Sequence, residues 1–190
     1  QNTAYEIPLR LVGSEMCIRD RVLIDEPHEE KRLCLNIQSL CTESNPTSII
    51  VRQQYEENPY PRWVDVGLFS QSFELENTYE QLGIDKSQRV APGNGKILVA
   101  GCGTGAHAIN VASKYKNCEV LAIDLSLKSL GYAKRKANEL EIDNLTFKRG
   151  DILDLPRLTD RFDLVESVGV LHHMENPEQF NKVLLKILEN

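Results

Sequence analysis

Hydrophobic positions change their spacing at Lys96. Beyond this residue, short apolar runs alternate with stretches in which apolar residues recur every three to four positions, as on one face of a helix. The runs predict strands at 97–100, 120–123, 145–149 and 162–167, and the spaced stretches predict helices at 105–115, at 127–140 and from Pro177 onward. Buried strands joined by helices indicate an α/β fold: a doubly wound, mostly parallel sheet with helices on both faces.

The part of the chain before Lys96 has a weaker pattern. It predicts helices at 28–44, 48–57 and 74–83. Between the second and third of these, Asn58-Pro-Tyr-Pro-Arg-Trp63 has two prolines in six residues. Such a segment cannot continue a helix and predicts a rigid, extended loop. We therefore divide the chain into an N-terminal segment of helices and loops at 22–95 and an α/β domain at 96–190.

Both ends of the sequence have unusual features. Residues 4–21 resemble the translation of a sequencing adapter, so we expect 1–21 to be a non-native segment that packs poorly. The helix that starts at Pro177 reaches Asn190 without the strand that a helix of this kind usually precedes. We therefore expect the α/β domain to be incomplete, with about four strands of a larger sheet.

Composition narrows the class of protein. With 190 residues, 41% of them hydrophobic and 26% charged, the chain is typical of a soluble globular protein. Its net charge of −6 disfavours nucleic acid as a partner, and no apolar run reaches the about 20 residues that span a membrane. The five cysteines contain no Cys-x-x-Cys pair, so we expect a reduced, cytoplasmic setting and no metal site.

Three glycines at alternate positions follow the first strand of the α/β domain. Gly101, Gly103 and Gly105 predict a tight turn that a ligand can approach closely, directly before a helix N-terminus. Asp124 ends the next strand, where a carboxylate can accept hydrogen bonds from a ribose diol. These features indicate a nucleotide-type cofactor. The glycines and Ala106 also fit the dinucleotide fingerprint, which leaves an NAD(P)-binding oxidoreductase open.

Two further segments follow the third and fourth predicted strands. Asp151 places a second carboxylate at the same edge of the sheet, and Glu166 begins a segment that ends in His172 and His173. Each residue also has a structural interpretation. Asp124 can be a helix N-cap, a role for which Ser126 competes, Asp151 can form a turn, and the histidines can be structural.

Taken together, four stretches resemble the class I S-adenosylmethionine-dependent methyltransferases: 97–105, 120–126, 147–156 and 162–173. The resemblance covers 96–190. It implies a Rossmann-like sheet of seven strands in the order 3-2-1-4-5-7-6, of which this chain would supply the first four. More narrowly, 51–63 is similar to the segment that precedes the catalytic domain in bacterial methyltransferases that often follow tetratricopeptide repeats.

The resemblance also implies residue roles toward S-adenosyl-L-methionine. The glycines would approach the methionine and ribose portion, Asp124 would bind the ribose hydroxyls, and Asp151 with the Ile152 backbone would face adenine. The full set of expected cofactor-binding residues is Tyr60, Ala100, Gly101, Cys102, Gly103, Gly105, Asp124, Leu125, Asp151, Ile152 and Ser167. Val99 departs from the family, which often has an acid there that orders the methionine end. We expect water or a residue of the 55–63 loop to replace that acid.

The expected reaction is methyl transfer, for which placing donor and acceptor in line supplies most of the rate. His172 and His173 are the candidate bases for an acceptor that must lose a proton. The fourth strand leads into Glu166-Ser-Val-Gly169 and not into the Asn/Asp-Pro-Pro-Tyr/Phe segment of enzymes that methylate DNA bases or glutamine amides. We therefore expect a small-molecule acceptor. The alternatives are the oxidoreductase and a fragment that binds S-adenosylmethionine without catalysis. Tyr55, Tyr60 and Trp63 form either an aromatic lid or packing contacts.

Overall fold

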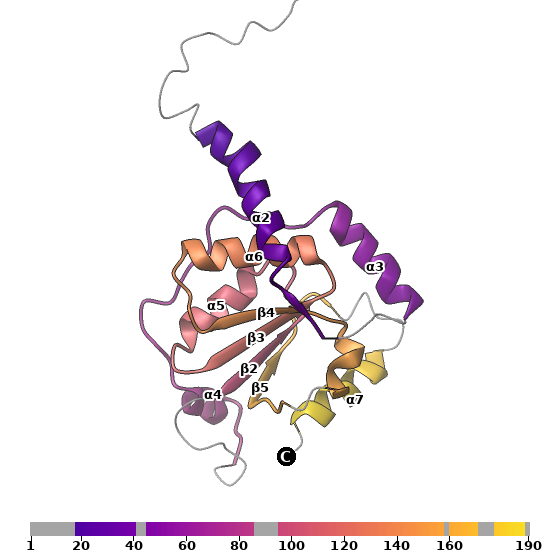
Figure 1. The fold of residues 1–190 in the computed structure, drawn as a ribbon. Coiled ribbons are helices and arrows are strands. Elements are labelled where there is room, and N and C mark those ends of the chain that lie inside the picture. Colours follow the sequence, from indigo (N-terminus) through magenta and orange to yellow (C-terminus); the bar gives the residue numbers. More distant parts are fainter. Residues whose placement is uncertain (1–17, 41–44, 86–94, 158–159, 171–176, 189–190) are drawn as a thin grey trace, which may run out of the picture.

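A parallel five-stranded sheet forms the centre of the molecule (Figure 1). The computed structural model describes residues 18–40, 45–85, 95–157, 160–170 and 177–188. Its strands are β1 (Gln38–Ser39), β2 (Lys96–Ala100), β3 (Glu119–Asp124), β4 (Leu145–Arg149) and β5 (Leu164–Glu166), in the order β1-β4-β3-β2-β5. The doubly wound α/β fold is therefore confirmed, as are the four strands expected after residue 95.

The short strand β1 was not expected. The predicted helix at 28–44 is wrong in its extent, because α2 (Glu26–Cys34) ends early and the chain then pairs with β4. Gln38 pairs with Lys148, and the Leu40 N–H donates to the Arg149 carbonyl at 2.8 Å. Backbone groups at a strand edge need partners. The extended conformation of β1 thus depends on β4, which lies more than 100 residues away in the sequence. The local pattern of apolar residues carries no sign of this contact.

Helices cover both faces of the sheet. The remaining elements are η1 (Arg21–Asp25), α3 (Pro46–Glu57), α4 (Leu75–Gln81), α5 (Ala106–Lys114), α6 (Leu127–Glu139), the 3-10 helix η3 (Ile152–Arg157) and α7 (Pro177–Leu188). Figure 1 shows α5 and α6 on one face and α7 on the other. A hydrophobic core lies on each face of the sheet, and alternate residues of β2 point into one or the other. Val99 packs with α5 and α6, whereas Leu98 packs with η3 and α7.

Helix α3 lies against the N-terminal end of α6. It begins at Asn45, whose side chain accepts hydrogen bonds from the N–H groups of Thr47 and Ser48. Near its other end, Glu56 Oε1 accepts from the Leu127 N–H at 2.6 Å, which places a carboxylate at the positive end of the α6 dipole. These contacts hold α3 beside the carboxyl ends of the strands.

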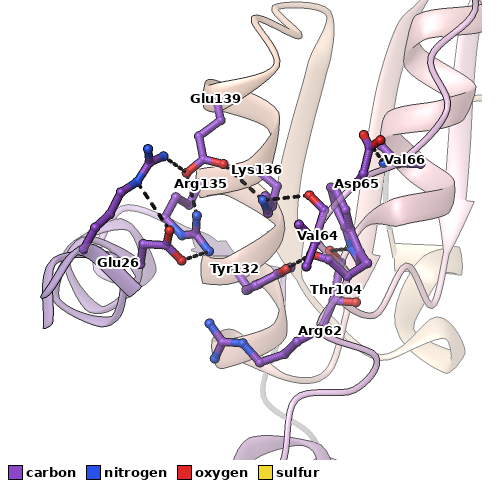
Figure 2. A network of polar contacts seen from close by, with 12 residues as sticks. Glu26, Arg62, Val64, Asp65, Val66, Thr104, Tyr132, Arg135, Lys136 and Glu139 are labelled. Carbon is purple, nitrogen blue, oxygen red and sulfur yellow. Dashed lines mark hydrogen bonds and ion pairs between the residues drawn. The ribbon is translucent and has the colours of Figure 1, made fainter. Parts of the chain in front are cut away.

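A buried arginine joins α2 to α6. Arg135, whose side chain is 1% exposed, lies 3.0 Å from Glu26 and 2.6 Å from Glu139 (Figure 2). It also lies 3.0 Å from Glu30. Arg62 adds a second cation at 2.7 Å from Glu30. The network therefore connects the N-terminal segment to the α/β domain.

The same face of α6 holds residues 61–64, which we call the strap. Tyr132 donates its hydroxyl hydrogen to the Trp63 carbonyl, and Lys136 Nζ lies 3.2 Å from the Val64 carbonyl oxygen (Figure 2). On the other side of the strap, the Thr104 hydroxyl donates to the Pro61 carbonyl. The strap thereby connects α6 to the glycine turn.

Residues 1–17 lie outside the described part of the chain, so the expected poor packing of 4–21 concerns mainly residues not described. Residues 18–20 are exposed. Arg21 lies 3.5 Å from Glu26 and 3.3 Å from Glu139, so a contact with the fold already exists at the predicted boundary. Within the described ranges, no helix combines the length and the apolar character that a membrane span requires.

Replacing Arg135 with Met should destabilise the protein, because three carboxylates would lose their shared cation. Removing one partner of a buried ion pair costs about 3–5 kcal/mol, and we expect about 2 kcal/mol here because the glutamates keep some contact with water. Urea unfolding measures the loss. Lys128→Met, an exposed position on the same helix, is the matched control and should change stability by less than about 0.5 kcal/mol. Equal losses in the two variants would contradict this role for Arg135.

Candidate functional site

A cavity of about 710 Å³ lies at the carboxyl edge of the sheet. Its floor comes from the segments that follow four adjacent strands: 101–104 after β2, 124–125 after β3, 150–153 after β4 and 168–170 after β5. Helix α3 and the Tyr60–Pro61 segment form the facing wall. Open α/β sheets bind ligands at this edge, and the volume is within the usual range for a small-molecule site.

The three glycines of the turn have different roles. A Cβ on Gly101 would lie 2.3 Å from Val170 Cγ2, and one on Gly105 would lie 2.5 Å from the Ala133 Cβ. A Cβ on Gly103 would meet nothing within 4 Å, and Gly103 lines the cavity. All three have positive φ angles, from 53° to 86°. Gly101 and Gly105 therefore permit close packing, and Gly103 is the glycine whose missing side chain leaves space for a ligand.

Asp124 joins the glycine turn to the end of β3. Its Oδ2 accepts the Gly103 N–H at 2.7 Å, and its Oδ1 accepts the Ser126 N–H at 3.0 Å. Burial raises the pKa of this carboxyl, and the backbone hydrogen bonds oppose that effect only in part. Ser126, whose hydroxyl accepts from the Ser129 N–H, caps α6, so the cap interpretation of Asp124 is wrong. The carboxylate still faces the cavity and keeps free lone pairs.

Asp151 forms a turn, as its structural interpretation predicts, and it also lines the cavity. It is 5% exposed and accepts the Leu153 N–H at 2.9 Å, so it shapes the turn that opens η3. Asp151 and Ile152 also line the cavity. The turn directs the backbone of η3 toward the site.

Most of the predicted cofactor residues line the cavity. They are Tyr60, Gly101, Cys102, Gly103, Asp124, Leu125, Asp151 and Ile152. Ala100, Gly105 and Ser167 do not line it, so for these three the predicted contact is not seen. Ala100 is fully buried and its carbonyl accepts the Ser167 hydroxyl at 2.9 Å, which places both residues beneath the floor. The candidate bases His172 and His173 lie outside the described residues.

The three aromatic residues Tyr55, Tyr60 and Trp63 were expected to form either a lid over the cavity or packing contacts, and the structure differs from one residue to another. Tyr55 and Tyr60 line the cavity. Trp63 instead packs edge-to-face on Tyr132 at 5.9 Å, and its Nε1–H donates to the Thr104 carbonyl at 3.0 Å. The lid interpretation therefore fits the two tyrosines, and the packing interpretation fits Trp63. Cys102 is a buried thiol whose pKa is raised by burial, which agrees with a small apolar role.

Sequence reasoning missed His107. It lies on the first turn of α5 and lines the cavity, with its Nε2 atom 2.8 Å from Glu166 Oε2. Only the pairing of β2 with β5 brings these two residues together, so their spacing in the sequence carries no signal. The wall formed by α3, including Ser48 and Val51, was missed for the same reason: its helix was predicted but its position was not.

Residues 97–189 match a family model described as a methyltransferase domain. (S)-Tetrahydroprotoberberine N-methyltransferase of Eschscholzia californica is 33% identical over 90 residues, which cover 46% of this chain and 25% of that enzyme. Release factor glutamine methyltransferase of Flavobacterium psychrophilum is 40% identical over 92 residues, which cover 48% of this chain and 32% of that enzyme. The chain thus spans a third or less of these relatives.

The fold has a counterpart among solved structures. Coclaurine N-methyltransferase bound to N-methylheliamine and SAH superposes with a TM-score of 0.53 at 19% identity. The match covers 93% of this chain and 55% of that chain. This likeness supports the architecture, including the part of the chain before the methyltransferase domain.

Alanine should destabilise the protein more at Gly105 than at Gly103, because only Gly105 is packed against another residue. Both Gly103→Ala and Gly105→Ala place alanine at a positive φ, at a cost of about 1–2 kcal/mol. Only Gly105→Ala adds a collision with Ala133, so we expect its total loss to reach about 3 kcal/mol. Thermal unfolding compares the two variants, each serving as the control for the other. A larger loss for Gly103→Ala would show that the turn packs differently.

Proposed function

We propose that the chain is a class I S-adenosylmethionine-dependent methyltransferase, because residues 97–189 match a methyltransferase domain, and that it binds S-adenosyl-L-methionine in the cavity and methylates a small molecule. The observation that carries the proposal is the sequence of polar groups along the floor. Asp151 follows β4, Asp124 ends β3, and the open Gly103 follows β2. This order matches a ligand with a base, a ribose and an extended substituent.

The proposed binding mode assigns one part of the ligand to each strand end. The Asp124 carboxylate would accept hydrogen bonds from the ribose hydroxyls, using lone pairs not taken by Gly103 and Ser126. Asp151 and the Ile152 backbone would face the adenine. The space beside Gly103 would admit the sulfur and its substituents. Tyr55 and Tyr60 would cover the ligand from the α3 side.

When bound, S-adenosylmethionine supplies an electrophilic methyl group on a sulfonium ion. The protein's contribution is to orient the acceptor in line with that group and to exclude water, because alignment supplies most of the acceleration in such displacements. Val168 and Val170 give the β5 side of the cavity an apolar surface. His172 or His173 remains the proposed base for an acceptor that must lose a proton.

A small-molecule acceptor is favoured over a glutamine amide or a nucleic acid base. Strand β5 ends at Glu166 and leads into Ser167-Val-Gly169, which has no proline. The net charge of −6 repels phosphate backbones. Among the relatives, tetrahydroprotoberberine N-methyltransferase is named for a small-molecule amine substrate. We therefore take small amines as the first acceptors to test.

Isothermal titration should detect binding of S-adenosylhomocysteine and not of NAD. Asp124→Asn should weaken that binding by about tenfold, since about 1.4 kcal/mol of hydrogen bonding to the ribose is lost. Asp143→Asn, at an exposed carboxylate before β4, is the matched control and should leave the affinity unchanged. Binding of NAD in preference to S-adenosylhomocysteine would contradict the proposed cofactor. Radiolabelled methyl transfer to a panel of amines would then separate an enzyme from a domain that only binds.

Binding of S-adenosylhomocysteine should weaken as the pH falls. The loss should begin at a higher pH than it would if Asp124 had the pKa of an ordinary aspartate. The pKa of Asp124 is raised by burial, so this carboxyl takes up a proton earlier as the pH falls. The protonated form loses acceptor capacity for the ribose hydroxyls. Titrations at successive pH values should give a declining affinity for the native protein and a flatter profile for Asp124→Asn. Identical profiles would argue against ionised Asp124 as the ribose ligand.

A further inference from the structure

We propose that His107 and Glu166 form the polar subsite for the amino acid end of the cofactor, in place of the acid that is absent at Val99. This inference rests on the proposed function. It assigns His107 to ligand contact and Glu166 to positioning His107. It also replaces our expectation that water or the 55–63 loop supplies the missing group.

Strand pairing places Glu166 next to the position of the missing acid. Val99 on β2 is the register partner of Glu166 on β5. Paired residues of adjacent parallel strands point to the same face of the sheet. Val99 packs in the core with residues of α5, so Glu166 also faces α5. A carboxylate is therefore present one strand away from Val99, on the same face.

His107 extends this carboxylate toward the cavity. Its Nε2 atom lies 2.8 Å from Glu166 Oε2, and the two side chains are 36% and 27% exposed. His107 lines the cavity, and Glu166 is not among the lining residues. The contact is at ion-pair distance, and the buried Nε2 atom has no hydrogen-bond partner, so the carboxylate restrains the imidazole by charge. Glu166 thus acts on the ligand through His107.

The position of the pair fits one end of the ligand. Along the floor the strand order is β4, β3, β2 and β5. If adenine lies over β4 and the ribose over β3, the remainder of the ligand extends past Gly103 toward β5. That remainder carries an ammonium and a carboxylate group. His107 is the one basic side chain among the described residues that line the cavity, so it is placed to meet the carboxylate group of that remainder.

Two ligands that differ in the amino acid portion test this assignment. S-Adenosylhomocysteine carries that portion, whereas 5′-methylthioadenosine has the same adenosine and sulfur without it. His107→Ala should weaken binding of S-adenosylhomocysteine by about tenfold, and Glu166→Gln by about threefold or more. Binding of 5′-methylthioadenosine should change by less than about twofold. His28→Ala, an exposed histidine on α2, is the control and should change neither affinity.

A double variant tests whether Glu166 acts through His107. His107→Ala combined with Glu166→Gln should bind S-adenosylhomocysteine no more weakly than His107→Ala alone, because the positioned group is already gone. Thermal unfolding of each variant reports any loss of the fold, and His107→Gln replaces the alanine variant if that one is unstable.

The outcomes distinguish the two proposals. Equal losses for both ligands, or no loss for either, would overturn the role of the His107–Glu166 pair while leaving cofactor binding intact. Failure of the native protein to bind either ligand would instead overturn the proposed function, and this inference with it.

Discussion

The hydrogen bond from the Gly103 N–H to the Asp124 carboxylate, 2.7 Å long, is the contact on which the site depends. It joins the turn after β2 to the end of β3 and so fixes the distance between the two central parts of the floor. The bond also places a carboxylate in a partly buried position, where hydrogen bonds from the backbone and from a ligand offset the cost of desolvation. The same residue therefore shapes the turn and is available to bind a diol.

The facing wall of the cavity comes from residues before 97, outside the part of the chain that matches a methyltransferase domain. Helix α3 is held by Glu56 at the N-terminus of α6, and the strap is held by Tyr132 and by Thr104. Since Thr104 belongs to the glycine turn, the strap and the turn constrain each other. Arg135 secures α2 on the same helix. The N-terminal segment is thus a structural part of the proposed cofactor site, and α6 is the element that connects the two.

Strands, helices and the glycine turn were predictable because their signals are local. The apolar runs in β2, β3 and β4 and the spacing in α5 and α6 depend on near neighbours in the sequence. Long-range contacts were not predictable from such patterns. The pairing of β1 with β4, the separate packing partners of Gly101 and Gly105, and the meeting of His107 with Glu166 each join distant residues. The sequence therefore predicted the floor of the site better than its wall.

The central claim is that the cofactor lies along the carboxyl edge from β4 to β5. A crystal structure of the protein with S-adenosylhomocysteine tests it most directly. We expect the adenine beside Asp151 and Ile152, the ribose hydroxyls on Asp124, and the amino acid end between Gly103 and His107. A ligand bound outside this cavity, or bound with its amino acid end beside Asp151, would contradict the account.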